Sequence, residues 1–232
     1  MVFLDDDSLA APDLLEQYKI AYYEHKNVGV VGGHIYLKKP EQLDSIFGLP
    51  GWERFWSQFV TRYQDYSEVQ NWWEFPWGAN WSARREALLK VGGFRTQYGR
   101  KGNDFSGGEE LVAAQMAKEI GYKVAILPYA SVIHDVKPER FTLEHVKNTI
   151  RSGIITHYEA QLRLHASQDT TLKSSFMGIG NYLIELLKIF RVDKTSRKLL
   201  LLEKKYYLMA YLNLLSRQIN VFFDRVMKNQ IK

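Results

Sequence analysis

The chain opens with a short apolar segment that ends in three consecutive carboxylates. This segment reads Val2-Phe3-Leu4-Asp5-Asp6-Asp7, a pattern typical of a β-strand that ends in an acidic turn. Carboxylates packed this closely repel one another and lose hydration, so such a cluster persists where a cation neutralises it. Asp5 and Asp7 are therefore candidate metal ligands. In an alternative interpretation, Asp7 or Ser8 caps a helix that runs from about Pro12 to Glu24.

Size and composition predict one folded domain with an appendage. The chain has 232 residues, of which 46% are hydrophobic, and this is enough for a core. It contains no cysteine, which excludes disulfide and thiolate chemistry and favours a reducing compartment. No uncharged stretch approaches the roughly 20 residues that span a bilayer. We therefore expect a cytoplasmic protein, peripheral on the inner face of the membrane.

The net charge of +5 is unevenly distributed. Residues 173–232 carry 12 Lys and Arg against 4 Asp and Glu, whereas the first 172 residues carry 19 against 22. Leu199, Leu202, Tyr206 and Met209 recur at helical spacing, so this basic tail is predicted to be amphipathic. Such a tail suits contact with an anionic membrane surface, or packing on its own domain or a partner. The basic residues form no recognised nucleic-acid-binding motif, so no nucleic-acid partner is expected.

Hydrophobic periodicity and glycine punctuation predict an α/β fold followed by a helical extension. The elements expected in the first part are a helix at 12–24, a strand at 28–37, a helix at 82–91, a polar loop at 95–108, a helix at 109–121 and a strand at 122–128. From residue 141 onward the pattern is helical, with helices expected at 142–166, 173–190 and 197–228.

Several motifs follow one another in the first 140 residues. They are Asp5-Asp6-Asp7, Trp77-Gly78-Ala79-Asn80 leading to Arg84-Arg85, Gly92-Gly93-Phe94, Gly108-Glu109-Glu110, and His134. In this order they resemble the family 2 glycosyltransferases of the A-type fold, over about residues 2–140. The segment from His134 to Gly153, with Pro138-Glu139-Arg140-Phe141, is similar to the cyanobacterial polysaccharide-synthesis members of that family.

The resemblance implies a Rossmann-like A-type sheet that is incomplete. Residues 1–140 would be the metal and acceptor half of a catalytic domain, and residues 141–232 the helical extension. In the family, strands and helices that hold the nucleotide base precede the carboxylate strand, whereas here only Met1 precedes it. We therefore expect that an upstream segment or another polypeptide completes the sheet. The isolated chain should bind donor poorly and turn over slowly or not at all.

The resemblance also implies an activity. Such enzymes move a sugar from a nucleotide-diphospho-sugar donor to a saccharide or lipid-linked acceptor, with inversion, in polysaccharide or cell-envelope glycan synthesis. The charge that develops on the departing diphosphate calls for a divalent cation, Mg²⁺ or Mn²⁺. By resemblance Asp7 would be its direct ligand, Asp5 would lie near the ribose or the water shell of the metal, and His134 would add a metal or phosphate contact.

An acceptor hydroxyl is a poor nucleophile until a base removes its proton. Glu109 and Glu110 follow two glycines at a predicted helix start, where the helix dipole favours an ionised carboxylate. Glu110 matches the position of the family's base and Glu109 is its neighbour, although the family more often has aspartate in the second place. The alternative interpretation is the ordinary acidic first turn of a helix.

Further residues are implied in donor or acceptor binding. Trp77 beside Gly78 offers a flat apolar surface on which a sugar ring could stack, and Asp6, Asn80 and Arg84 would contact the donor sugar or its phosphates. Core packing is the alternative for Trp77, and a solvated helix position is the alternative for Arg84.

Two other functional classes remain open. A strand ending in Asp5-Asp6-Asp7 also resembles the haloacid-dehalogenase phosphatases, with Asp5 as nucleophile, Asp7 as general acid and Gly102-Asn103-Asp104 as a later acidic motif. However, Ser8-Leu9 stands where that family has threonine or valine. The third class is non-catalytic, either a truncated remnant or an interaction module that binds through its basic tail.

Overall fold

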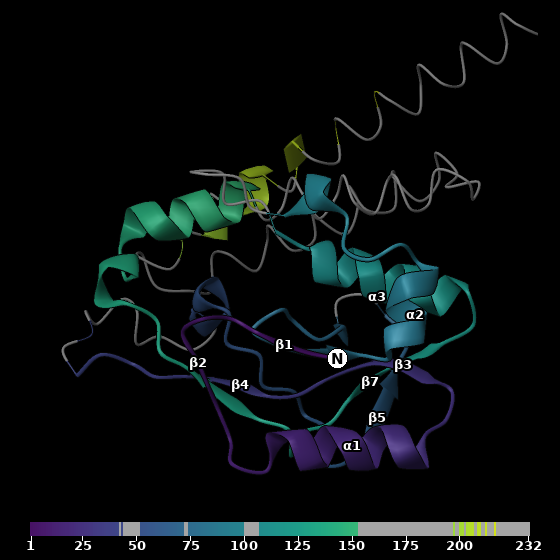
Figure 1. Cartoon of the computed structure of the whole chain (residues 1–232). Helices are drawn as coiled ribbons and strands as arrows, with labels where there is room; N and C mark the ends of the chain where they lie inside the picture. The colour runs from purple at the N-terminus through teal and green to yellow at the C-terminus, as the bar shows by residue number, and fades with distance from the viewer. Residues whose placement is uncertain are drawn as a thin grey trace, which may run out of the picture. The chain divides into compact units, whose positions relative to one another are not determined.

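The computed structural model describes residues 1–41, 43, 52–71, 74–99 and 107–152, and near the C-terminus 197, 200, 201, 203–206, 208, 209, 212 and 216. The chain divides into two compact units, of which the first contains residues 1–103 and 107–146 and the second 104–106 and 147–232. All helices and strands given below belong to the first unit (Figure 1). The helix predicted at 173–190, and the greater part of those at 142–166 and 197–228, lie outside the described residues.

A five-stranded mixed sheet forms the centre of the first unit. Its order is β1 (Val2–Leu4), β6 (Asn80–Ala83), β3 (Val28–Gly32), β7 (Lys123–Ile126) and β5 (Ser67–Val69). β3 and β7 are parallel, and the other neighbours are antiparallel. Every residue of β3 is buried, as expected for a valine- and glycine-rich strand between two layers. The mixed α/β content is compatible with the predicted Rossmann-like fold.

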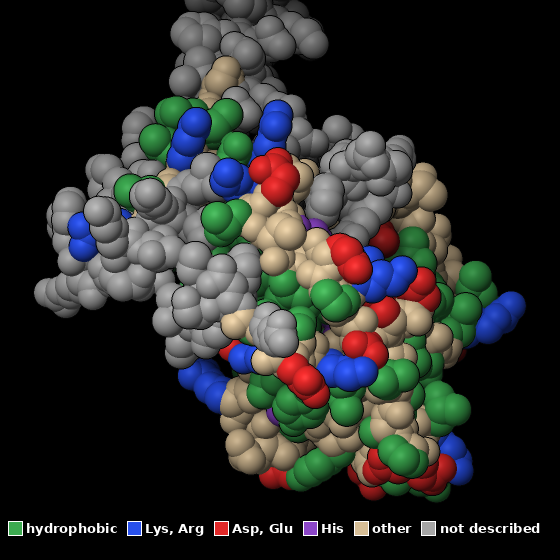
Figure 2. All heavy atoms as spheres, turned by 90° about the vertical axis from the view of Figure 1, so that its left-hand side faces the viewer, with side chains coloured by type: hydrophobic (Ala, Val, Ile, Leu, Met, Phe, Trp, Pro, Cys, Tyr) green, Lys and Arg blue, Asp and Glu red, His purple; other side chains and the backbone are tan. Residues whose placement is uncertain are grey.

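A second sheet of three strands continues from the first. It contains β2 (Ser8–Ala10), β8 (Val132–His134) and β4 (Ile35–Leu37) in that order, with β8 antiparallel to β2 and parallel to β4. Leu9, Ile133 and Tyr36 occupy facing positions on the three strands and are all exposed. Figure 2 shows charged side chains of both signs scattered between apolar groups on the face that lies at the left of Figure 1.

The single strand predicted at 28–37 is wrong, because the chain changes sheets at Gly33. β3 ends at Gly32 in the larger sheet, and β4 begins at Ile35 in the smaller one. The backbone of Gly33 passes so close to Ala130 that a Cβ atom there would lie 1.5 Å from the Ala130 carbonyl oxygen. The approach of these two backbones therefore requires glycine at this position.

Helices cover both faces of the larger sheet. α1 (Leu14–Glu24) lies on one face, and α2 (Arg85–Lys90) and α3 (Glu109–Glu119) lie on the other (Figure 1). Ala113, Ala114 and Ala117 of α3 are buried, so their small side chains let the helix approach β3 and β7 closely. Gly121 at φ +96° follows α3 and confirms the predicted stop.

Two boundaries of the predicted elements need correction. The helix predicted at 82–91 begins only at Arg85, because residues 80–83 form β6 between β1 and β3. The loop predicted at 95–108 contains a 3₁₀ turn, η3 (Thr96–Tyr98), and its residues 100–106 lie outside the described residues. Two further 3₁₀ turns, η1 (Glu53–Trp56) and η4 (Pro138–Arg140), lie in the first unit.

Within the described part of the chain, no helix has the length and apolar character needed to cross a membrane.

Candidate active site

The acidic run connects the two sheets. β1 ends at Leu4 and β2 begins at Ser8, so Asp5, Asp6 and Asp7 form the turn between them, closed by the Ser8 amide donating to the Asp5 carbonyl at 3.0 Å. The alternative in which Asp7 or Ser8 caps the first helix is wrong, because β2 intervenes and Asp13 occupies the N-terminal cap of α1.

Pairing between β2 and β8 brings His134 to this turn. Ser8 and His134 face each other in the register, and the Asp135 amide donates to the Asp7 carbonyl at 2.8 Å. His134 Nε2 consequently lies 3.0 Å from Asp7 Oδ1 and 3.9 Å from Asp5 Oδ2. The side chains of His134 and Asp7 are only 3% and 14% exposed, whereas that of Asp5 is 50% exposed. Two of the three groups are therefore held inside the fold and one faces solvent.

The orientation of the His134 ring is fixed by a hydrogen bond of Nδ1, the ring nitrogen that does not face Asp7. Its Nδ1 atom lies 2.7 Å from the carbonyl oxygen of Trp56, and because a carbonyl oxygen only accepts hydrogen bonds, Nδ1 carries the hydrogen. Nε2 is then the ring nitrogen that faces Asp7 Oδ1. In the neutral ring Nε2 is an acceptor like the carboxylate oxygen, so a proton or a metal ion has to lie between them.

The donor set of this cluster fits a divalent cation. Asp5, Asp7 and His134 each offer one ligand atom, and these atoms lie within 4.8 Å of one another. Two carboxylates and one imidazole suit Mn²⁺, and the carboxylates alone suit Mg²⁺ with water completing its shell. A backbone carbonyl that orients the ring of a histidine ligand is a usual companion of metal sites.

Arg140 completes the surroundings of Asp7 and was not predicted as a functional residue. Its Nη1 atom lies 3.3 Å from Asp7 Oδ2. The Trp56 indole N–H donates to the Arg140 carbonyl at 3.0 Å, and the Trp56 ring stacks on Phe141 at 4.7 Å. The sequence showed the Pro138-Glu139-Arg140-Phe141 segment only as part of a family resemblance. A single arginine in a 3₁₀ turn has no periodic signal that would assign it to a site.

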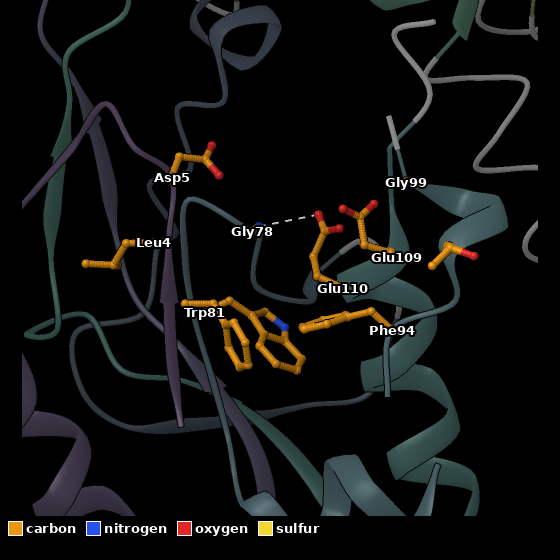
Figure 3. Close-up of a pocket in the computed structure, with 10 residues that line it drawn as sticks. Leu4, Asp5, Gly78, Trp81, Phe94, Gly99, Glu109 and Glu110 are labelled. Carbon is orange, nitrogen blue, oxygen red and sulfur yellow. Dashed lines mark hydrogen bonds between the residues drawn. The ribbon is translucent and has the colours of Figure 1, made fainter. Parts of the chain in front are cut away.

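A pocket of about 620 Å³ lies beside the cluster, and Asp5 belongs to both. The carboxylates of Asp5, Glu109 and Glu110 lie at one side of this pocket, with the Asp5 carboxylate directed toward the glutamate pair (Figure 3). Phe3, Trp81 and Phe94 form an aromatic floor, with ring centroids 5.0 to 5.6 Å apart. The remaining lining residues are Leu4, Gly78, Thr96 and Gly99. Acidic groups thus lie directly above an apolar surface.

The carboxyl group of Glu110 in this pocket is strongly perturbed. Burial, and to a smaller extent the charges of Glu109 and Asp5, raise the pKa of Glu110 from 4.5 to about 7. The Gly78 amide donates to Glu110 Oε1 at 3.3 Å and partly opposes this rise. Both glutamates stand in the first turn of α3, as predicted. A carboxyl group that titrates near neutral pH is suited to take up and release a proton there.

The structure uses other predicted binding residues within the fold. Asn80 is fully buried, where its Nδ2 donates to the carbonyls of His34 and Ala130 at 3.0 and 2.7 Å and its Oδ1 accepts from the Tyr18 hydroxyl at 2.6 Å. These contacts tie β6 to the crossing between the two sheets. None of the polar atoms of the Asn80 side chain is directed to the pocket lining.

Of the other four residues predicted to bind donor or acceptor, Gly78 lines the pocket, and Arg84, Trp77 and Asp6 lie outside that lining. The Arg84 guanidinium donates to the carbonyls of Tyr22, His25 and Val28 and so closes the end of α1. Trp77 is half-buried and packs on Phe59 with ring centroids 5.3 Å apart. Asp6 is exposed at the tip of the acidic turn. Trp72, Trp73 and the Gly102-Asn103-Asp104 segment lie outside the described residues.

Comparison with known proteins links the chain to one enzyme class. No protein-family model matches the sequence. Over 141 residues the chain is 29% identical to the glucosyl-dolichyl phosphate glucuronosyltransferase of Haloferax volcanii, and the match covers 58% of this chain and 42% of that relative. The chain therefore spans less than half the length of the curated relative that it matches. This similarity to a glycosyltransferase agrees with the resemblance drawn from the motifs.

Proposed function

We propose that the chain carries the catalytic groups of a glycosyltransferase that uses a nucleotide-diphospho-sugar donor, a divalent cation and a lipid-linked saccharide acceptor. The observation that carries the proposal is the position of Asp5. It belongs to the cluster with Asp7 and His134 and also lines the pocket that contains Glu110. Cation ligands and a proton acceptor therefore adjoin one cavity, which is the arrangement that sugar transfer from a diphosphate requires.

Asp5, Asp7 and His134 would hold Mg²⁺ or Mn²⁺ on the donor side. When bound, the cation neutralises charge on the diphosphate as the sugar leaves. The Trp56 carbonyl keeps the His134 ring turned with Nε2 toward the two aspartates. This leaves the fold little reorganisation to make when the donor arrives.

Glu110 would act on the acceptor side. The acceptor oxygen forms a bond to the anomeric carbon, and the bond from that carbon to the diphosphate oxygen breaks with its electron pair remaining on the diphosphate. The acceptor proton passes to Glu110, whose pKa of about 7 allows it to be ionised before attack and to hold the proton afterwards. Attack from the face opposite the departing diphosphate inverts the anomeric centre.

The aromatic floor suits an acceptor with apolar surfaces. Phe3, Trp81 and Phe94 pack on one another beneath the carboxylates, and such a surface favours the apolar faces of a sugar ring or a lipid segment. The name of the Haloferax volcanii relative describes a dolichyl-phosphate-linked sugar, which supports a lipid-linked acceptor. We place the reaction in cell-envelope glycan synthesis at the cytoplasmic face of the membrane. The basic tail that would contact the membrane lies mostly outside the described residues.

A transfer assay tests the proposal. The purified chain is incubated with Mn²⁺, a panel of uridine and guanosine diphosphate sugars and a synthetic polyprenyl-phosphate-linked glucose, and the product is followed by mass spectrometry. From the isolated chain we expect slow, cation-dependent transfer that falls at least about 100-fold in Glu110→Gln. Glu16→Gln is the matched control, because Glu16 is exposed on α1 and outside the pocket lining.

The same samples separate the alternatives. Release of phosphate from p-nitrophenyl phosphate without any nucleotide would favour the phosphatase. Absence of both turnover and cation-dependent binding of uridine diphosphate would favour a non-catalytic module.

A further inference from the structure

We infer that the Arg140 guanidinium is a second positive group of the site, in addition to the divalent cation. It neutralises Asp7 in the ligand-free protein and turns to the donor diphosphate once a divalent cation occupies the cluster of Asp5, Asp7 and His134. The inference rests on the proposed function, because it takes a diphosphate as the ligand. It adds a functional residue, and a competition between that residue and the divalent cation for Asp7, neither of which the motif resemblance assigned.

Both oxygens of the Asp7 carboxylate already have partners. Oδ1 faces His134 Nε2 at 3.0 Å, and Oδ2 faces Arg140 Nη1 at 3.3 Å. A divalent cation held by the cluster would share this carboxylate with the guanidinium, so two positive groups would lie on one anion. Like charges this close repel each other, and Arg140 and the cation therefore weaken each other's hold on Asp7.

Of the two side chains that contact the Asp7 carboxylate, His134 and Arg140, that of Arg140 has more freedom to move. The His134 side chain is 3% exposed and is fixed through Nδ1 to the Trp56 carbonyl. The Arg140 side chain is 38% exposed and reaches Asp7 on a long flexible stem. When a cation joins the cluster, rotation of this stem relieves the repulsion without disturbing the fold.

The backbone that carries Arg140 stays in place during this movement. The Trp56 indole N–H donates to the Arg140 carbonyl, the Arg140 amide donates to the Lys137 carbonyl at 3.0 Å, and Phe141 stacks on Trp56. Trp56 thus holds the backbone of Arg140 through its side chain and the ring of His134 through its carbonyl. The guanidinium remains within reach of the cluster whichever anion it meets.

A diphosphate is the ligand that suits the released guanidinium. The planar fork of Arg donates two parallel hydrogen bonds to adjacent phosphate oxygens, and these charge-assisted bonds are stronger than neutral ones. The diphosphate gains negative charge as it separates from the sugar, so a mobile cation beside the cluster is most useful at that stage.

Two binding measurements on the full chain test the inference, because it requires opposite effects of one substitution. In Arg140→Gln, Mn²⁺ titrated without any anion should bind about fivefold more tightly than in the wild type, since the competing cation is gone. Inorganic pyrophosphate titrated at saturating Mn²⁺ should bind about tenfold or more weakly. A merely structural role for Arg140 would weaken both.

Two further variants sharpen the test. Arg140→Lys keeps the positive charge but loses the two parallel N–H donors of the guanidinium. Mn²⁺ affinity should therefore stay near that of the wild type, while pyrophosphate binding is only partly retained. Lys19→Gln removes the same charge from the exposed surface of α1, where Lys19 pairs with Glu16, and should change neither affinity more than about twofold.

The outcomes are distinct. Weaker or unchanged Mn²⁺ binding in Arg140→Gln, beside normal Mn²⁺ binding in the wild type, overturns the inference alone. Unchanged pyrophosphate binding in Arg140→Gln does the same. Failure of the wild type to bind Mn²⁺ overturns the metal-dependent function and the inference together.

Discussion

His134 Nε2 lies 3.0 Å from Asp7 Oδ1, although 127 positions of the chain separate the two residues. The contact is made where β2 and β8 pair, and the Trp56 carbonyl behind the ring assigns Nε2 to it. The Nε2 lone pair of a neutral imidazole and a carboxylate oxygen repel each other at this distance unless a proton or a metal ion lies between them. The protein therefore holds a place for a proton or a metal ion at this contact.

The first prediction concerns cation binding by the acidic turn. Asp7→Asn should raise the dissociation constant of Mn²⁺ about tenfold or more, because a ligand charge is lost next to His134. Asp6→Asn removes the same charge from the same turn, but Asp6 is outside the cluster and should change the constant by less than about threefold. Calorimetric titration without donor measures both. Equal effects of the two variants would show general attraction by the turn and contradict a defined site.

The second prediction concerns the pH dependence of transfer. With Glu110 as base, kcat/KM should rise from pH 5 to pH 8 with a midpoint near 7, because the carboxylate must be ionised and its pKa is about 7. Glu109→Gln should move this midpoint to lower pH, since the Glu109 charge raises the pKa of Glu110. A midpoint that stays in place in Glu109→Gln would show that another group is titrating.

The third prediction is a pH-dependent gain in stability on replacing Glu110. The folded protein holds the Glu110 proton more tightly than the unfolded chain, so folding stability falls as pH rises from 4.5 to about 7 and is constant above that. Glu110→Gln removes this loss and should exceed the wild type by at most about 3 kcal/mol at pH 8, with no such gain below pH 4.5. Urea unfolding at several pH values measures the difference, with Glu16→Gln as the exposed control. A difference that does not vary with pH would contradict the perturbed pKa.

The fourth prediction separates structure from donor binding at Asn80. Asn80→Ala leaves buried partners unsatisfied and should destabilise the fold by about 3 kcal/mol, whereas Tyr18→Phe removes only the hydroxyl that donates to Asn80 and should cost about 1 kcal/mol. The two substitutions share a contact, so the double variant should lose less than the sum. Denaturant unfolding measures these values, and the donor KM of Tyr18→Phe should be unchanged. A raised donor KM with full stability in Asn80→Ala would restore the donor role.

Long elements with a clear pattern were predictable from the sequence. The helix predicted at 12–24 appears as α1 from Leu14 to Glu24, and the helix predicted at 109–121 appears as α3, which Gly121 follows. The strand predicted at 122–128 contains β7. In each case local propensity and periodicity agree, and for α3 the terminating glycine agrees as well, so the prediction did not depend on distant parts of the chain.

Short strands were not predictable in the same way. β2, β5 and β8 each contain three residues, too few for a periodic pattern. Residues 82 and 83 were predicted as the start of a helix, yet residues 80–83 form β6 because they pair with β1 on one side and β3 on the other. Pairing with distant segments decided these elements, and a sequence window does not contain that information.

The site shows the same division. Asp5, Asp7 and His134 were named from motif order, and the structure brings them together. Arg140 was missed because its contact with Asp7 depends on the Trp56 anchor 84 positions away. Trp81 was also passed over in favour of Trp77, and only the three-dimensional packing shows which tryptophan lines the pocket.

The close passage of Gly33 by Ala130 constrains how this protein could change. His134 belongs to the smaller sheet and Asp7 directly precedes β2 of that sheet, whereas Glu110 stands on a helix that packs on the larger sheet, and the chain passes from one sheet to the other at Gly33. The spacing between Glu110 and the Asp7–His134 pair therefore depends on how closely these two backbones approach each other. A methyl group added at residue 33 would collide with the Ala130 carbonyl and force the two backbones apart, which would move these side chains relative to each other without altering any of them.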